Sequence, residues 1–222
     1  MNYIEIKNKL MSMDTSCLMD ADGSLRLLNS TVKPIHVKPI KMAGKAFTVS
    51  CFDDFLTVVK ALSEAKEGDI LVVDGQGGEL ALAGEIFSTE AKRKGLSGIV
   101  IDGAVRDIAG IRALDFPVYA RSVNPKAGST QKLGSINAPV NCGGTTINPG
   151  DIVFGDMDGI IVADASSMAK TIAIADIIQN KEDQVLTLIN SGRSLFDLLN
   201  LEEHTLNIEN ARESRLKFLL PQ

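Results

Sequence analysis

Continuous apolar runs alternate with segments of helical spacing through the first half of the chain. Four such runs predict buried strands, at residues 46–51, 70–73, 98–101 and 117–120. Before and between them the spacing predicts helices, at residues 4–12, 55–62, about 84–94 and 106–112. Strands that alternate with helices are typical of the α/β class.

The pattern changes in the second half, where three predicted strands follow one another with only turns between them. They lie at residues 140–147, 152–154 and 160–162. The Asn-Pro-Gly-Asp segment 148–151 is a strong turn signal. A long helix is predicted from about 166 to 189, Gly192 can end it, and the tail keeps a helical pattern. Since no low-complexity linker or internal repeat divides the chain, we expect one domain over residues 1–222, with helical extensions at both ends.

Composition narrows the classes of function. The 222 residues carry a formal net charge of -5, aromatic residues make up 5%, and tryptophan is absent, which together argue against binding of nucleic acid. The sequence has no apolar run long enough to cross a bilayer and no signal-peptide pattern at its start. Cys17, Cys51 and Cys142 are far apart and odd in number, which is typical of a reducing compartment. We therefore expect a cytoplasmic protein whose partners include neither nucleic acid nor a membrane.

One short constellation carries candidate chemistry. Asp102, Arg106 and Asp107 follow directly on the apolar run 98–101, so they lie at the carboxyl end of a predicted strand, where α/β proteins place their active sites. An arginine can bind a substrate carboxylate through two parallel hydrogen bonds, and a neighbouring carboxylate can hold a divalent cation such as Mg²⁺. On spacing alone, the pattern equally fits a surface Arg-Asp pair in which Asp107 caps the next helix.

A second feature lies about twenty residues upstream. If a helix begins at Gly84, the first amides, over Glu85, Ile86 and Phe87, have no partner within the helix and can bind a carboxylate or a phosphate. Gly84 would let such an anion approach the backbone closely. Without the downstream Arg-Asp pair, Glu85 would be interpreted as an ordinary carboxylate in a first helical turn, where the helix dipole favours it.

Two other signals are weak. The glycine-rich segment 74–78 has neither the Gly-Lys-Ser/Thr ending of a Walker loop nor the spacing of the dinucleotide fingerprint, so a surface turn fits it as well as a nucleotide cradle does. His36 and His204 are isolated in the sequence, and no partner for a zinc site or a Ser-His-Asp triad can be placed. We interpret both histidines as structural or surface residues.

Several segments together resemble the RraA-like family, and in particular its branch of class II 4-hydroxy-4-methyl-2-oxoglutarate/4-carboxy-4-hydroxy-2-oxoadipate aldolases. The residues that carry the resemblance are 68–75, Gly84-Glu85, 98–107, 148–151 and 156–162. The resemblance spans roughly residues 43 to 190 and is looser at the ends of the chain. It implies an α/β/β/α sandwich of the swivelling phosphohistidine-domain type, assembled as homotrimers or homohexamers, with the site at the subunit boundary.

The resemblance also implies roles for individual residues. Aldolase members carry an aspartate, twenty intervening residues and then Arg-Asp, and here Glu85, one methylene longer, stands at the first position. Asp107 would ligate Mg²⁺ or Mn²⁺, Arg106 would hold the oxo acid, and the backbone amides of residues 84–87 would bind its carboxylate. Glu85 would hold the water that protonates the enolate. Glu182 falls where the family has an acid from the neighbouring subunit, although a solvated helix position fits Glu182 nearly as well.

The reaction implied is a divalent-metal-dependent retro-aldol cleavage of a 4-hydroxy-2-oxo diacid to pyruvate and a second oxo acid, with oxaloacetate decarboxylation as a side activity. No lysine lies in the constellation, and none is required for a metal-dependent reaction. The alternative is a non-catalytic RraA-type regulator that binds ribonuclease E. That branch lacks the acid after the arginine, whereas Asp107 is present here. A related lyase acting on a sugar-derived acid is a third alternative.

Overall fold

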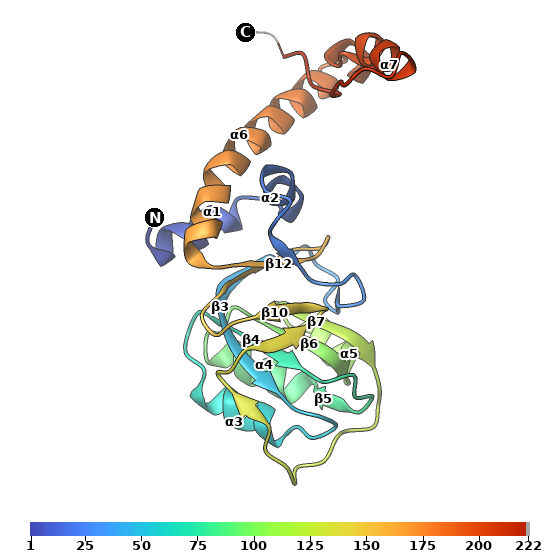
Figure 1. Ribbon diagram of the computed structural model, residues 1–222. Coiled ribbons are helices and arrows are strands. Elements are labelled where there is room, and N and C mark those ends of the chain that lie inside the picture. Colours follow the sequence, from blue (N-terminus) through green and yellow to red (C-terminus); the bar gives the residue numbers. More distant parts are fainter. Residues whose placement is uncertain (221–222) are drawn as a thin grey trace.

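The computed structural model describes residues 1–220, which are organised around one large mixed β-sheet (Figure 1). Eight of its ten strands follow the order β1-β12-β11-β3-β4-β6-β7-β2, while β5 pairs with β6 and β8 pairs with β3. β9 and β10 form a separate hairpin. The strands are β1 (Arg26–Leu27), β2 (Lys33–Pro34), β3 (Met42–Ser50), β4 (Asp69–Asp74), β5 (Ala81–Ala83), β6 (Gly98–Val105), β7 (Val118–Val123), β8 (Ser135–Ile136), β9 (Val140–Cys142), β10 (Thr145–Ile147), β11 (Ile152–Gly155) and β12 (Ile160–Ala163).

The parallel strands β3, β4, β6 and β7 form the centre of the sheet because their side chains are apolar on both faces. In β4, Leu71 and Val73 face a cluster with three helices, whereas Ile70 and Val72 face a cluster with the β9–β10 hairpin. The expected fold class, a mixed α/β chain, is confirmed. The helices are α1 (Tyr3–Met11), α2 (Thr15–Ala21), α3 (Leu56–Glu64), α4 (Glu85–Arg93), α5 (Ile108–Ala113), α6 (Ala165–Asn190) and α7 (Leu201–Glu209), with a 3₁₀ turn η1 (Leu195–Leu198).

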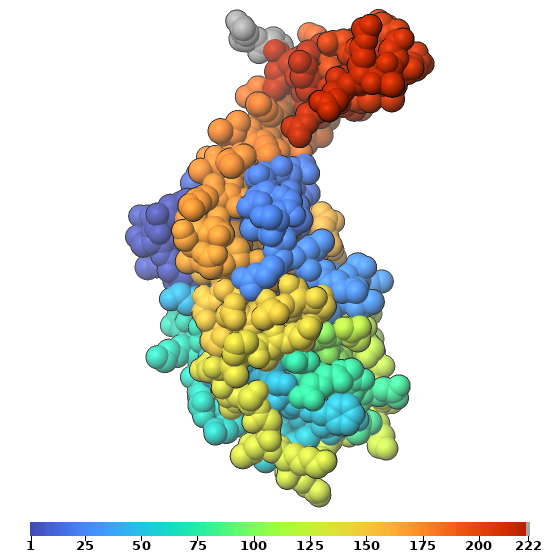
Figure 2. Space-filling view, in the orientation of Figure 1, coloured from blue at the N-terminus to red at the C-terminus, as the bar shows by residue number. Residues whose placement is uncertain are grey.

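The long helix α6 connects two parts of the molecule. Its start is capped by Asp164, whose side chain accepts hydrogen bonds from the amides of Ser166 and Ser167. Its first turns pack against α1, α2 and the antiparallel end of the sheet, as the buried positions Met168 and Ile172 show. The rest of α6 carries η1 and α7 away from the sheet, and this C-terminal arm (residues 186–220) stands clear of the body (Figure 2).

Three elements near the candidate site differ from the sequence-based expectations. β6 continues to Val105, well past the expected end at residue 101. α5 begins at Ile108, so Arg106 and Asp107 lie between strand and helix and not inside the helix. The short strand β5 was not predicted at all.

Among residues 1–220, no helix combines the length and the apolar character that crossing a bilayer requires.

Candidate active site

Strand β5 brings the two predicted parts of the site together. It runs parallel to β6, with Ala83 opposite Val105, and the Arg106 amide donates a hydrogen bond of 3.0 Å to the Ala83 carbonyl. Each strand is followed within three residues by a helix, α4 after Gly84 and α5 after Asp107. Two helix starts therefore lie side by side at the carboxyl edge of the sheet, as the position of the Arg-Asp pair predicted.

A small pocket opens at this edge. Its volume is ≈ 50 Å³, which is room for a few groups of the size of a water molecule. Apolar side chains form most of its wall, and Arg106 and Asp107 supply its charges. The lining residues are Phe55, Ala81, Leu82, Ala83, Gly84, Ile86, Phe87, Arg106, Asp107 and Ala127. The pocket thus collects five of the seven residues proposed from the sequence, whereas Glu85 and Glu182 are not part of its wall.

The carboxylate of Asp107 is not used by the helix that follows it. Asp107 occupies the N-cap position of α5 in a left-handed conformation (φ 56°), and its side chain makes no capping hydrogen bond. Asp107 therefore occupies the cap position that was considered for it, but its side chain does not cap the helix. Its Oδ2 atom lies 3.4 Å from Arg106 Nε, and both side chains are about 40% exposed, at 44% and 42%. Such an exposed pair contributes little to stability and leaves both groups available to a ligand.

The start of α4 offers unpaired amides, as predicted, but one face of Gly84 is already covered. A Cβ atom at position 84 would stand 2.6 Å from Asp107 Oδ2 and 3.0 Å from Arg106 Cγ, so the Arg-Asp pair lies directly on this glycine. Gly84 has no side chain to cap the first turn of α4. The amides of Glu85, Ile86 and Phe87 therefore lack a capping partner next to the charged pair.

Asp102, which the sequence groups with the Arg-Asp pair, serves the fold instead. It is buried, its Oδ1 atom pairs with Arg121 Nε, and its Oδ2 atom accepts a hydrogen bond of 2.7 Å from the Gly143 amide. Arg121 belongs to β7, which lies beside β6 in the sheet, and Gly143 belongs to the turn of the β9–β10 hairpin. Asp102 thus fastens the hairpin to the sheet and does not line the pocket.

Sequence reasoning missed Phe55 and Ala127, which close the pocket from another side. Phe55 packs edge-on against Phe87, with ring centroids 5.7 Å apart. The segment around Ala127 is tied down by the buried Asp54, whose Oδ2 atom accepts hydrogen bonds from the Ser129 hydroxyl and from the Gln131 amide. Burial alone would raise the pKa of Asp54, but these and further hydrogen bonds hold it down at about 2.

Glu182 lies on α6, outside the pocket of its own chain. Its Oε2 atom accepts a hydrogen bond of 3.1 Å from Cys17 Sγ, and burial together with this carboxylate raises the pKa of Cys17 to about 12. The thiol is therefore a hydrogen-bond donor and not a nucleophile at neutral pH.

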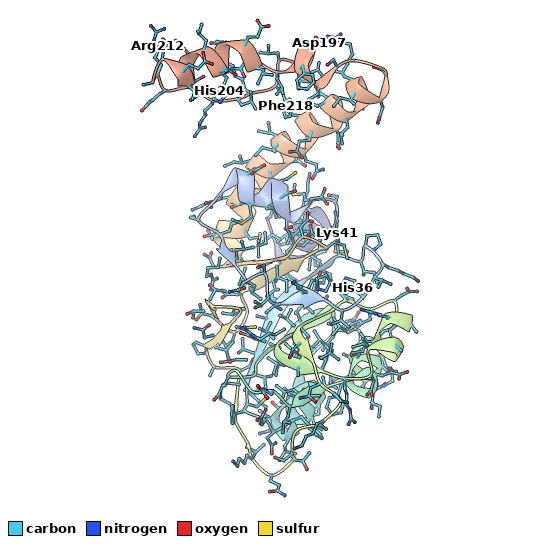
Figure 3. All side chains as sticks on the ribbon, turned by 90° about the vertical axis from the view of Figure 1, so that its right-hand side faces the viewer. His36, Lys41, Asp197, His204, Arg212 and Phe218 are labelled. Atoms are coloured by element: carbon cyan, nitrogen blue, oxygen red, sulfur yellow. The ribbon has the colours of Figure 1, made fainter. Side chains whose placement is uncertain are left out.

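The two histidines are far apart, His36 in the body and His204 in the arm (Figure 3). His36 is buried with Nδ1 3.2 Å from the Val118 carbonyl oxygen, and His204 Nδ1 lies 3.0 Å from Ser214 Oγ. Both contacts agree with the structural interpretation, and the separation rules out a site that the two histidines share.

Among the described residues, no group of three or more histidine, cysteine, aspartate or glutamate side chains comes together as a metal-binding cluster. A structural zinc site, which needs four such ligands, has no counterpart in residues 1–220. Mg²⁺ and Mn²⁺ are different, because Mg²⁺ keeps several waters and uses one or two carboxylates. Asp107 is an oxygen donor of that kind, half-exposed at the mouth of a pocket and free of a capping bond, and so it fits such an ion.

The architecture and the site define an α/β protein with a charged pocket at the carboxyl ends of parallel strands. The sequence model of the RraA-like family, described as Aldolase/RraA, matches residues 15–162. A protein of Halalkalibacterium halodurans, provisionally named 4-hydroxy-4-methyl-2-oxoglutarate aldolase, is 39% identical over 161 residues, which are 72% of this chain and 76% of that protein. The chain therefore belongs to the RraA-like family.

Solved structures agree with this assignment. The RNA-processing inhibitor RraA of Thermus thermophilus is 30% identical, with a TM-score of 0.63 over 68% of this chain and 92% of its own. An uncharacterised protein of Pseudomonas syringae pv. tomato has a TM-score of 0.78 over 87% of this chain and 96% of its own. At 24% identity, this second likeness concerns the fold alone. The chain thus resembles one relative with the name of an enzyme in sequence and one with the name of a regulator in sequence and fold.

Proposed function

We propose that the protein is a divalent-metal-dependent lyase that cleaves a 4-hydroxy-2-oxo diacid by a retro-aldol reaction, releasing pyruvate and a second oxo acid. The observation that carries this proposal is the position of Asp107. Its carboxylate lies beside Arg106 in a pocket, next to the uncapped start of α4, and takes no part in capping α5. The aldolase name of the relative from Halalkalibacterium halodurans supports the same class.

Arg106 and the start of α4 would bind the pyruvate half of the substrate. The guanidinium can donate two parallel hydrogen bonds to a carboxylate, and the first amides of α4 can donate to the same group or to the neighbouring oxygen. Both kinds of donor stabilise the negative charge that spreads over the three-carbon fragment when the C3–C4 bond breaks. Phe55, Leu82 and Phe87 form an apolar wall that excludes water from this charge.

Asp107 is the residue that would hold the cation, Mg²⁺ or Mn²⁺. When bound, such an ion supplies a Lewis acid for the 2-oxo group. Arg106 lies close enough to Asp107 to help orient its carboxylate. The same electrostatic arrangement would also favour loss of CO₂ from oxaloacetate, which gives the same enolate of pyruvate, and we propose this as a side activity.

Proton transfer would fall to two glutamates. Glu85, in the first turn of α4, is exposed and next to the pocket, so it can exchange a proton with a water near the reacting carbon. Glu182 lies on α6 against Cys17 and does not line the pocket of its own chain. We propose that it acts in the site of a second copy within a homotrimer or homohexamer. Mixing an Asp107→Ala protein with a Glu182→Ala protein tests this arrangement. Recovery of activity on subunit exchange supports it, whereas mixtures that stay inactive while both variants oligomerise contradict it.

The direct test is a screen of 4-hydroxy-2-oxo diacids and of oxaloacetate, with pyruvate release as the measurement, in Mg²⁺ or Mn²⁺ and again with EDTA. We expect release that stops when EDTA is added and returns with excess cation. Release that is unaffected by EDTA contradicts the metal dependence. No release from any 2-oxo acid contradicts the lyase proposal as a whole.

The second candidate is a non-catalytic regulator that binds ribonuclease E, and the observation that favours it is the likeness to the RNA-processing inhibitor RraA of Thermus thermophilus. The two candidates separate in one pair of measurements, pyruvate release and inhibition of purified ribonuclease E. Inhibition by a protein that releases no pyruvate would establish the regulator.

A further inference from the structure

The backbone conformation at Gly110, within helix α5, does not require a glycine. The residue is not among the glycines with a positive φ. In a helix interior, glycine is less favourable than alanine, because it loses more conformational freedom on folding. A glycine at this position therefore suggests that something else needs the space of a side chain.

The side chain of Glu85 occupies that space. A Cβ atom at position 110 would overlap the carboxylate carbon and Oε2 of Glu85, and it would stand 2.7 Å from Glu85 Cγ. The carboxylate of the first residue of α4 thus lies on the backbone of α5, across the contact between these two helices. The Glu85 side chain is exposed, and no ion pair or hydrogen bond fixes it among residues 1–220, so the space left at Gly110 decides where its carboxylate can lie.

A second glycine at this corner, Gly84, is covered by a carboxylate from the other helix start, that of Asp107. Gly84 is extended (φ -161°), a conformation open to any residue, yet a Cβ atom there would meet Asp107 Oδ2 at 2.6 Å. Asp107 therefore lies on the glycine that precedes α4, and Glu85 lies on the glycine within α5. Gly84 and Gly110 thus leave the space in which these two carboxylates lie.

We propose that Gly110 is a positioning residue. By leaving room for the longer side chain of Glu85, it sets where that carboxylate lies relative to Arg106 and Asp107. The expected effect on kcat rests on the proposed function, whereas the expected position of the Glu85 carboxylate does not.

Gly110→Ala tests the proposal. Because the overlap involves the far end of a flexible side chain, the alanine moves the Glu85 carboxylate and leaves α5 intact, so the melting temperature stays equal or rises slightly. A displaced proton-transfer group lowers kcat roughly tenfold or more while KM stays within about twofold. A crystal structure of the variant shows the carboxylate moved off position 110.

A double-mutant cycle separates positioning from a general effect on α5. In a Glu85→Ala background no side-chain atom beyond Cβ is left to meet position 110, so adding Gly110→Ala changes the remaining kcat by less than about twofold. Gly159→Ala is the matched control, because a Cβ atom there meets only Leu27 Cδ1 at 3.9 Å, and it leaves kcat unchanged.

Three results overturn the proposal. The first is a Gly110→Ala protein with the kcat of the wild type, and the second is a loss of the same size with and without the Glu85→Ala substitution. The third is a crystal structure of Gly110→Ala in which the Glu85 carboxylate has not moved. If the wild type releases no pyruvate at all, the proposed function fails, and the crystal structure then still decides whether Gly110 sets the place of this carboxylate.

Discussion

Two kinds of carboxylate lie near the carboxyl ends of the central strands, and they differ in what their oxygens touch. Asp54 and Asp102 are buried, and each accepts hydrogen bonds from at least one backbone amide and from one side chain. Asp107 and Glu85 are exposed, and each lies on a glycine. The first pair holds loops and a hairpin in place, whereas the second pair is free to meet a ligand.

The comparison shows that spacing in the sequence does not decide which carboxylate does what. Asp102 and Asp107 are five residues apart, and each has an arginine beside it. Asp102 lies within β6 and its partner comes from the neighbouring strand, so the pair is fixed by the sheet. Asp107 lies beyond the strand, and its partner is the adjacent residue. The end of β6 therefore separates the structural pair from the proposed catalytic pair.

The largest effect on activity is expected from Asp107→Ala, which tests whether this exposed carboxylate serves the reaction. Loss of the proposed cation ligand should lower pyruvate release at least about a hundredfold. The melting temperature should fall by only about 2–4 °C, because the side chain is exposed and caps no helix, and the loss comes from placing alanine in a left-handed conformation. Asp115→Ala, an exposed aspartate that also pairs with a cation, is the control and should keep full activity. Activity equal to the wild type would remove Asp107 from the site.

A smaller loss is expected from Arg106→Lys. Lysine keeps the positive charge but cannot donate the paired hydrogen bonds of a guanidinium, so kcat/KM should fall roughly tenfold to a hundredfold. Steady-state kinetics with a 2-oxo acid would place most of this loss in KM if Arg106 binds the carboxylate in the ground state. Arg112→Lys, on the exposed side of α5, is the matched control. Equal values for both variants would contradict a binding role for Arg106.

The fold was predictable where the residues of a single strand form a recognisable pattern by themselves. β4 and the start of β6 are continuous runs of branched apolar residues, and both were expected within a few residues of their observed bounds. β5 was missed because Ala81–Ala83 is short and alanine has no preference for strands. It forms because β6 is long enough to pair with it, and this pairing brings Gly84 next to Arg106.

The site was predictable only in part, for a related reason. Arg106 and Asp107 could be proposed because strand ends collect ligands in α/β folds. The pairing of Asp102 with Arg121 depends on the register of β6 against β7, and the contact of Glu85 with Gly110 depends on the packing of α4 on α5. No local pattern encodes either contact.

On the structural side of the comparison, Asp102→Ala should reduce stability and spare the pocket. The variant leaves the Gly143 amide without its acceptor and Arg121 without its partner, although Arg121 is 39% exposed and can turn to water. We expect a loss of about 2 kcal/mol, which corresponds to a fall of roughly 5 °C in melting temperature for a chain of this size. Pyruvate release per folded molecule should be unchanged, and Asp115→Ala should cost less than about 0.5 kcal/mol. A stable but inactive Asp102→Ala protein would contradict the division between the two pairs.

The last and smallest difference is expected in how stability depends on pH in acid, and it concerns Asp54. The pKa of Asp54 is lowered from 3.8 to about 2 in the folded chain, so the unfolded chain binds more protons between these values. The stability that Asp54 contributes is therefore fully present above about pH 4 and is lost as the pH falls towards 2. In Asp54→Asn this contribution is already missing at neutral pH, so its melting temperature should depend less on pH in this window. Asp183→Asn, on the exposed side of α6, should follow the wild type, and parallel curves for the wild type and Asp54→Asn would show that the hydrogen bonds to Asp54 do not depend on its charge.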